Sequence, residues 1–89
     1  MKYSYVRFPA NTEITYGDID SSGNVQIRVE TPVDGGFNSL GCILPSYTIT
    51  EQVGYTQNQV ADLLSFIQNN AHLIIEYATV GGFENAAAI

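Results

Sequence analysis

The pattern of apolar and polar residues predicts strands over the first 53 positions. The clearest run is 25–30, in which valine and isoleucine occupy every second position and polar residues occupy the others, as expected for a strand with one buried face. Shorter alternating runs cover 3–8 and 13–16. An extended stretch covers 39–53, where Pro45 cannot donate to a strand ladder and so marks a break, a bulge or an edge. We therefore expect four or five strands in an antiparallel sheet covered on one side.

From Thr56 onward the spacing of apolar residues changes to that of a helix. Thr56 is a suitable N-cap, and the spacing predicts a helix over about 57–80 that ends at Gly81. A straight helix of that length would measure about 36 Å, whereas a globule of this size spans about 31 Å. We therefore expect a kink or short break near Asn69–Asn70. The apolar face consists of Val60, Leu63, Leu64, Ile67, Ala71, Ile74, Ile75 and Ala78.

These elements predict an α+β fold in one domain, 1–89. The chain has 89 residues, which is enough for a single core. It divides into a strand-rich part at 1–53, a helical part at 56–80 and a short tail at 81–89. The expected arrangement is an open antiparallel meander with the C-terminal helix across one face.

Charge is sparse and mostly negative. The chain has nine carboxylates and three cations, Lys2, Arg7 and Arg28, and its formal net charge is −6. Binding to nucleic acid or to an anionic membrane surface needs clustered cations, so neither is expected. No run of 18 apolar residues and no signal-peptide pattern occurs, so we expect a cytoplasmic protein. A basic protein partner remains compatible with this charge.

Two groups of residues are weak candidates for a metal site. Asp18 and Asp20 open a segment like a calcium loop, but Val29 stands where the loop needs a bidentate glutamate, and a polar turn explains the segment better. His72 and Glu76 lie four residues apart on the polar helix face, without the third ligand that a metal needs. Neither group is complete, so we expect no metal, no cofactor and a solvated helix face.

Cys42 lies in an apolar stretch. The sequence contains no nucleophile-elbow serine motif and no glycine-rich phosphate-binding loop. The expected state of Cys42 is a buried, inert thiol. An enzymatic function is therefore less favoured than a non-catalytic one.

The six tyrosines are the least ordinary feature of the composition. They fit either cross-strand packing or a contact surface. If Val6 and Phe8 face the core, strict alternation exposes Tyr3, Tyr5 and Arg7 together, and this patch is the interaction surface that the sequence predicts.

Three functions follow, in decreasing order of support. The first is a non-catalytic interaction module that binds a protein partner, or a second copy of itself, through an exposed tyrosine-bearing sheet face. The second is an acidic inhibitor or antidote of a basic enzyme such as a nuclease. The third is a small enzyme or metal protein that uses His72 and Glu76.

Overall fold

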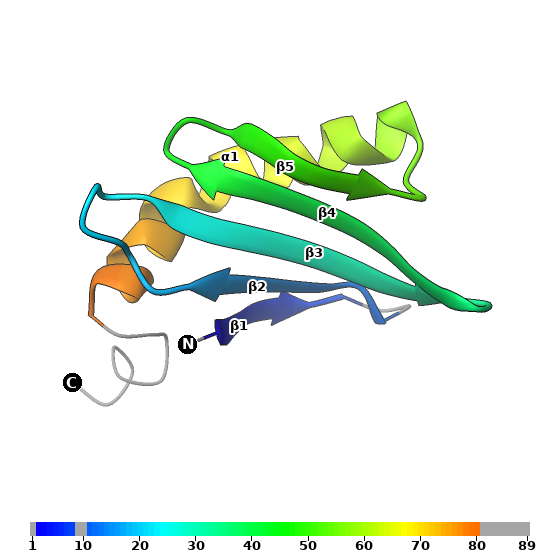
Figure 1. The fold of residues 1–89 in the computed structure, drawn as a ribbon, viewed down its shortest axis with the longest axis horizontal. Helices are drawn as coiled ribbons and strands as arrows, with labels where there is room; N and C mark the ends of the chain where they lie inside the picture. The colour runs from blue at the N-terminus through cyan, green and yellow to red at the C-terminus, as the bar shows by residue number, and fades with distance from the viewer. Residues whose placement is uncertain (1, 9–10, 81–89) are drawn as a thin grey trace.

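The computed structural model describes residues 2–8 and 11–80, and over these residues it shows five strands followed by one helix (Figure 1). Each strand pairs antiparallel with the next one in the chain, which gives the sheet order β1-β2-β3-β4-β5. The α+β class and the meander are therefore as predicted. The elements are β1 Lys2–Arg7, β2 Glu13–Gly17, β3 Val25–Val33, β4 Gly36–Leu44, β5 Thr48–Val53 and α1 Gln57–Thr79.

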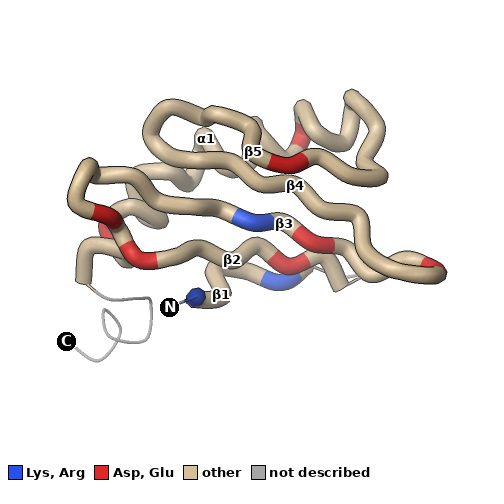
Figure 2. The backbone as a smooth tube through the Cα atoms, viewed as in Figure 1, with Lys and Arg blue, Asp and Glu red and all other residues tan. Residues whose placement is uncertain are grey.

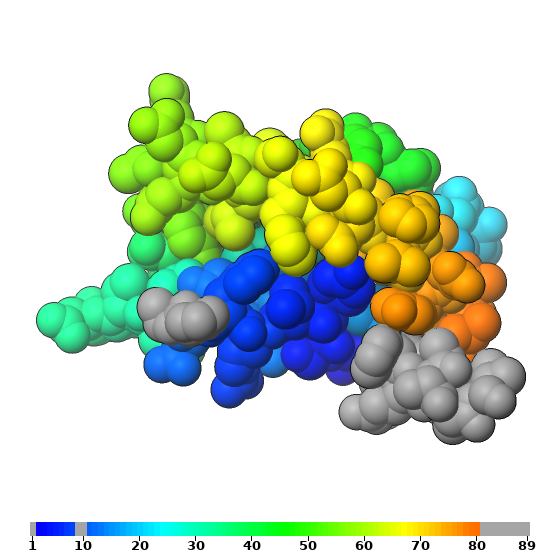
Figure 3. Space-filling model, turned by 180° about the vertical axis from the view of Figure 1, so that it is seen from behind, coloured from blue at the N-terminus to red at the C-terminus, as the bar shows by residue number. Residues whose placement is uncertain are grey.

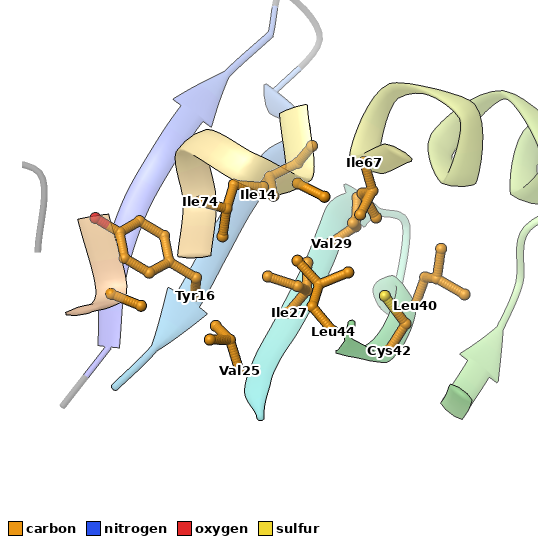
Figure 4. Packing of buried hydrophobic residues seen from close by; sticks show 12 residues of the cluster. Ile14, Tyr16, Val25, Ile27, Val29, Leu40, Cys42, Leu44, Ile67 and Ile74 are labelled. Carbon is orange, nitrogen blue, oxygen red and sulfur yellow. The ribbon is translucent and has the colours of Figure 1, made fainter. Parts of the chain in front are cut away.

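The hydrophobic core lies between one face of the sheet and α1 (Figure 4). Alternate residues of β2, β3 and β4 supply its sheet side, and four residues of α1 supply the other side. Ile67 and Ile74 are fully buried at two points along the helix. Burying a side chain of this size contributes about 1.5–3 kcal/mol, so these two residues fix α1 on the sheet. The buried set is Ile14, Tyr16, Val25, Ile27, Val29, Leu40, Cys42, Leu44, Ile67, Ala71, Ile74 and Ala78.

The start of α1 matches its sequence prediction. Thr56 is the N-cap: its hydroxyl accepts from the Gln59 backbone N–H at 3.2 Å, and Gln59 Oε1 accepts from the Thr56 N–H at 2.9 Å. This reciprocal pair is a capping box, which satisfies two N–H groups that would otherwise lack partners. The predicted cap at Gly81 and the tail at 81–89 lie outside the described residues.

The expected interruption at Asn69–Asn70 does not occur, because α1 is one helix of 23 residues. Its length of about 34 Å fits along the longest dimension of the molecule, 39 Å. The expectation failed because it assumed a sphere, whereas the molecule measures 39 × 25 × 21 Å. Asn70 is accommodated inside the helix, where it donates to the Phe66 carbonyl at 2.8 Å and accepts from the Tyr5 hydroxyl at 2.7 Å. Within the described residues, no helix has the length and apolar character to cross a membrane.

A hairpin of β3 and β4 projects beyond the rest of the sheet. The last pair between β2 and β3 is Glu13 with Glu30, and the last pair between β4 and β5 is Ser39 with Val53. Residues 31–38 therefore form a two-stranded ribbon, which Figure 3 shows as a teal finger. We call these residues the projecting hairpin. The turn at its tip is short, because β3 runs to Val33 and β4 starts at Gly36.

Candidate functional site

No helix of the described part of the chain lies on the second face of the sheet, and we call it the open face. It consists of the residues that alternate with the core residues along each strand, so cross-strand neighbours on it form rows. One row holds Thr15, Arg28, Gly41 and Glu51, in order from β2 to β5. The open face is turned toward the viewer in Figure 2, with α1 behind it.

All three cations of the chain lie on the open face, and each forms an ion pair with a carboxylate; Figure 2 marks their positions along the strands. Arg7 lies 3.3 Å from Glu13, Lys2 lies 3.8 Å from Glu30, and Arg28 pairs with Glu51 at 3.2 Å. We call these six residues together the ionic row, although they span more than one set of cross-strand neighbours. Exposed ion pairs contribute little stability, typically below about 1 kcal/mol each. The row instead makes this face electrically neutral, and the net charge of −6 comes from the six carboxylates outside it.

Glu13 and Glu30 stand directly opposite each other on β2 and β3, a placement that is unfavourable when neither charge is compensated. Each carboxylate has its own partners. Glu13 accepts from the Ser4 hydroxyl at 3.0 Å and from Arg7 at 3.3 Å. The Ser4 hydrogen bond, opposed by partial burial and assisted by Arg7, lowers the pKa of Glu13 below its ordinary value. Glu13 therefore keeps its negative charge at neutral pH, directly opposite Glu30.

Gly41 is the reason that Arg28 can reach Glu51. The three residues lie in one row, with Gly41 on the middle strand. Arg28 crosses above Gly41 and makes two hydrogen bonds to the carboxylate, at 3.2 and 3.4 Å. A Cβ atom at Gly41 would lie 2.6 Å from the Thr50 hydroxyl. A glycine inside a strand often marks such a close approach.

Replacing Gly41 by alanine should therefore lower the free energy of unfolding by about 1–2 kcal/mol. The added methyl group would push Thr50 aside and lift the Arg28 side chain from Glu51. Chemical denaturation with urea measures the effect. Gly36→Ala is the matched control, because a Cβ atom there meets nothing within 4 Å. Equal stability of the two variants would contradict the role given to Gly41.

Exposed apolar side chains lie at the end of the open face nearest the projecting hairpin. Phe37 is 58% exposed and Val53 is 53% exposed. Phe37 stands opposite Pro32, and both line a shallow hollow of about 230 Å³. The other residues that line it are Arg7, Asn11, Glu13 and Glu30. The hollow is therefore lined both by the Phe37 ring and by three members of the ionic row, Arg7, Glu13 and Glu30.

The structure separates the residues of the predicted Tyr3–Tyr5–Arg7 patch. Only Arg7 lies on the open face, whereas Tyr3 and Tyr5 are half-buried against the core. The reason is a bulge: Ser4 pairs with Thr15 and Val6 pairs with Ile14, so Tyr5 is an extra residue in β1. A bulge shifts the alternation by one position, and it turns both tyrosines toward α1.

These tyrosines form a packed cluster on the helix side. Tyr16 lies 5.3 Å from Tyr3 and 6.4 Å from Tyr5, measured between ring centroids, and Tyr77 of α1 lies 6.3 Å from Tyr5. The Tyr3 hydroxyl donates to Asp18 at 2.8 Å. Burial, and then the nearby Tyr77, raises the pKa of Tyr5. This arrangement is the cross-strand packing of tyrosines, which was the alternative to an exposed contact surface.

The structure places the two weak metal candidate groups in different parts of the fold, the β2–β3 loop and α1. Asp20 accepts from the backbone N–H groups of Ser22 and Asn24, both at 2.9 Å, and so closes its own turn. His72 and Glu76 are exposed on the outer face of α1. Across residues 2–8 and 11–80, the structure brings together no group of three or more histidine, cysteine, aspartate or glutamate side chains that could hold a metal ion.

Cys42 faces the core from β4 and is 1% exposed. Burial raises the pKa of its thiol from 9.0 to about 11. Because the thiolate is the nucleophilic form, the raised pKa keeps Cys42 in its protonated, weakly nucleophilic form at neutral pH, and its burial is as the sequence predicts.

Phe37, Val53 and the Arg28–Glu51 pair were not predicted as site residues. The sequence does hold one usable signal for the first, since an aromatic residue directly after the Asp34–Gly35–Gly36 turn belongs to the exposed start of a strand. Comparisons with protein-family models, with curated proteins and with solved structures found nothing that matches this chain.

Proposed function

We propose that this protein is a non-catalytic interaction module that binds a protein partner through the open face of its sheet. The observation that carries this proposal is the exposure of Phe37 and Val53, each more than half accessible, beside a fully paired row of charges. Interfaces combine aromatic and arginine anchors with a polar rim, and the open face offers both.

The ionic row supports binding by a protein rather than by a charged polymer. Because its charges are paired within the chain, the row presents no uniform field that would attract nucleic acid or an anionic membrane. Paired charges of both signs instead select a partner with a complementary arrangement, and they add specificity more than affinity. The anchors are then the exposed Phe37 and Val53 side chains, which would pack against apolar side chains of the partner.

The test compares tagged chains purified from their producing cells after mild cross-linking, with associated proteins measured by quantitative mass spectrometry. The double variant Phe37→Ser, Val53→Ser should lose about 90% or more of at least one associated protein, as expected for an anchor worth about 1.4 kcal/mol or more. Val80→Ser is the matched control, since Val80 is 41% exposed but lies at the end of α1, and it should retain the association. If no associated protein distinguishes the two variants, the proposal fails.

A second function, an acidic inhibitor or antidote of a basic enzyme, is favoured by the location of the excess negative charge. The described carboxylates outside the ionic row lie in the β2–β3 loop, at the tip of the projecting hairpin and on α1 (Figure 2). They are Asp18, Asp20, Asp34, Asp62 and Glu76. The double variant Asp62→Asn, Glu76→Gln should then weaken the association and its dependence on salt, while the Phe37 and Val53 variants leave both unchanged.

A further inference from the structure

A second cavity lies on the helix side of the sheet, away from the open face. Its volume is about 340 Å³, at the lower end of the range for small-molecule sites, about 300–1,000 Å³. Thr31 and Asn38 line it from the sheet, Thr12 lines it from the loop before β2, Tyr55 lines it from the loop before α1, and the first turns of α1 complete it. Figure 3 shows these turns, in yellow-green, above the base of the projecting hairpin.

Three hydroxyl groups form a chain along this cavity. Thr31 Oγ1 lies 2.7 Å from Thr12 Oγ1 and 2.8 Å from the Tyr55 hydroxyl oxygen, and either partner can be the donor in each hydrogen bond. Three hydroxyls carry three hydrogens, and the two bonds use only two of them. One hydrogen therefore remains available whichever way the chain is oriented. Such a chain can donate to a ligand or accept from it, with the direction set by the ligand.

The other polar groups supply fixed donors and acceptors. Gln59 uses its Oε1 atom in the helix cap, which leaves the two hydrogens of its side-chain nitrogen for a ligand. Asp62 is an exposed carboxylate on the next turn of α1 and only accepts. Asn38 packs over Gly54, where φ is +86° and where a Cβ atom would collide with the amide. The absent side chain at Gly54 thus makes the space in which Asn38 reaches the cavity.

The charges and the apolar surface of the residues that line the cavity restrict the class of ligand that it can bind. Among the described residues that line this cavity there is no lysine or arginine, and the one charged group is the Asp62 carboxylate, so an anion such as phosphate is disfavoured. The Tyr55 ring and Leu63 give the wall apolar surface. A molecule with many hydroxyl groups on a saturated ring meets all of these features, since its hydroxyls both donate and accept and its C–H faces pack on apolar side chains.

We propose that this cavity binds a small neutral polyhydroxylated molecule, a monosaccharide or a cyclitol. The site is separate from the open face, because it lies on the helix side of the sheet. The two sites share the projecting hairpin, because Thr31 and Asn38 lie at its base and Phe37 lies beside them on the open face.

The test is a titration followed by nitrogen–proton NMR spectra of the whole chain. D-glucose, D-mannose and myo-inositol would each be added up to about 20 mM, which saturates a site with a millimolar Kd. At least one should produce saturable shifts at Thr12, Thr31, Tyr55 and Gln59. D-glucose 6-phosphate serves as the charged counterpart and should bind at least about tenfold more weakly than the corresponding neutral sugar.

Two variants remove single groups from the cavity. Thr31→Val removes the central hydroxyl while keeping the shape of the side chain, and it should raise the Kd by about fivefold to tenfold. Asp62→Asn changes an exposed group, so it tests the site even if the valine variant does not fold. Thr79→Val is the matched control, because Thr79 bonds only within α1, and its Kd should not change. The proposal is overturned if none of the three neutral molecules gives saturable shifts at this cavity, or if Asp62→Asn binds as the native chain does.

Discussion

Replacing Ile74 by alanine should lower the free energy of unfolding by about 3–4 kcal/mol. Ile74 is fully buried between α1 and the sheet (Figure 4), so the substitution removes three carbon atoms and leaves a cavity. A domain of this size has a total stability of only about 5–10 kcal/mol. The variant should therefore be close to the limit of folding, and thermal and urea denaturation would measure the loss.

Two companion variants make this test specific to the position of α1. Ile75→Ala changes the next residue, which is half-buried, and should cost less than half as much. Ile67→Ala lies two turns earlier on the same buried face and should cost about the same as Ile74→Ala, in a single transition. If Ile74→Ala instead loosens only the C-terminal part of the helix, while Ile67→Ala unfolds the whole chain, α1 does not act as one continuous unit.

Raising the pH from about 8.5 to 11 should lower the free energy of unfolding by about 2–3 kcal/mol through Cys42 alone. Burial raises the pKa of its thiol from 9.0 to about 11 in the folded state. Below the unfolded pKa the thiol is protonated in both states, so this contribution to stability is fully present. Between the two values only the unfolded chain loses its proton, and the contribution falls by about 1.4 kcal/mol per pH unit.

Cys42→Ala isolates this effect from those of other groups. The variant loses some packing at every pH, but its stability should fall less steeply than that of the native chain between pH 9 and pH 11. Tyr3 and Tyr5, whose pKa values are both raised, add a loss of the same sign to both proteins. Urea denaturation at a series of pH values measures the two slopes, and parallel slopes would show that Cys42 does not titrate as described.

The sequence predicts those parts of this fold that depend on local periodicity. The alternation at 25–30 became the centre of β3, and the 3.6-residue spacing together with Thr56 placed α1 to within one residue at its end. Helix continuity could not be derived in the same way, because it depends on the elongated shape of the molecule. That shape follows from strand lengths and from the projecting hairpin, which exist only once the strands are paired.

The candidate site was harder to predict, because one unpaired residue reverses the direction of its neighbours. The bulge at Tyr5 has no marker such as glycine or proline, so strict alternation gave both tyrosines the wrong direction. Gly41 is visible in the sequence, but its purpose depends on Arg28 and Glu51, which lie on the two strands beside it. Phe37 is exposed because β2 and β5 end before they reach it, and strand ends are the least predictable boundaries.

The measurement that tests the central proposal most directly is photo-crosslinking in the producing cells. A photoreactive phenylalanine derivative would replace Phe37 on the open face in one sample and Ser65 on the exposed side of α1 in another. The proposed function requires a discrete cross-linked product from position 37 that is absent or much weaker from position 65. A product from position 65 alone, or from neither position, would contradict an open face that binds protein.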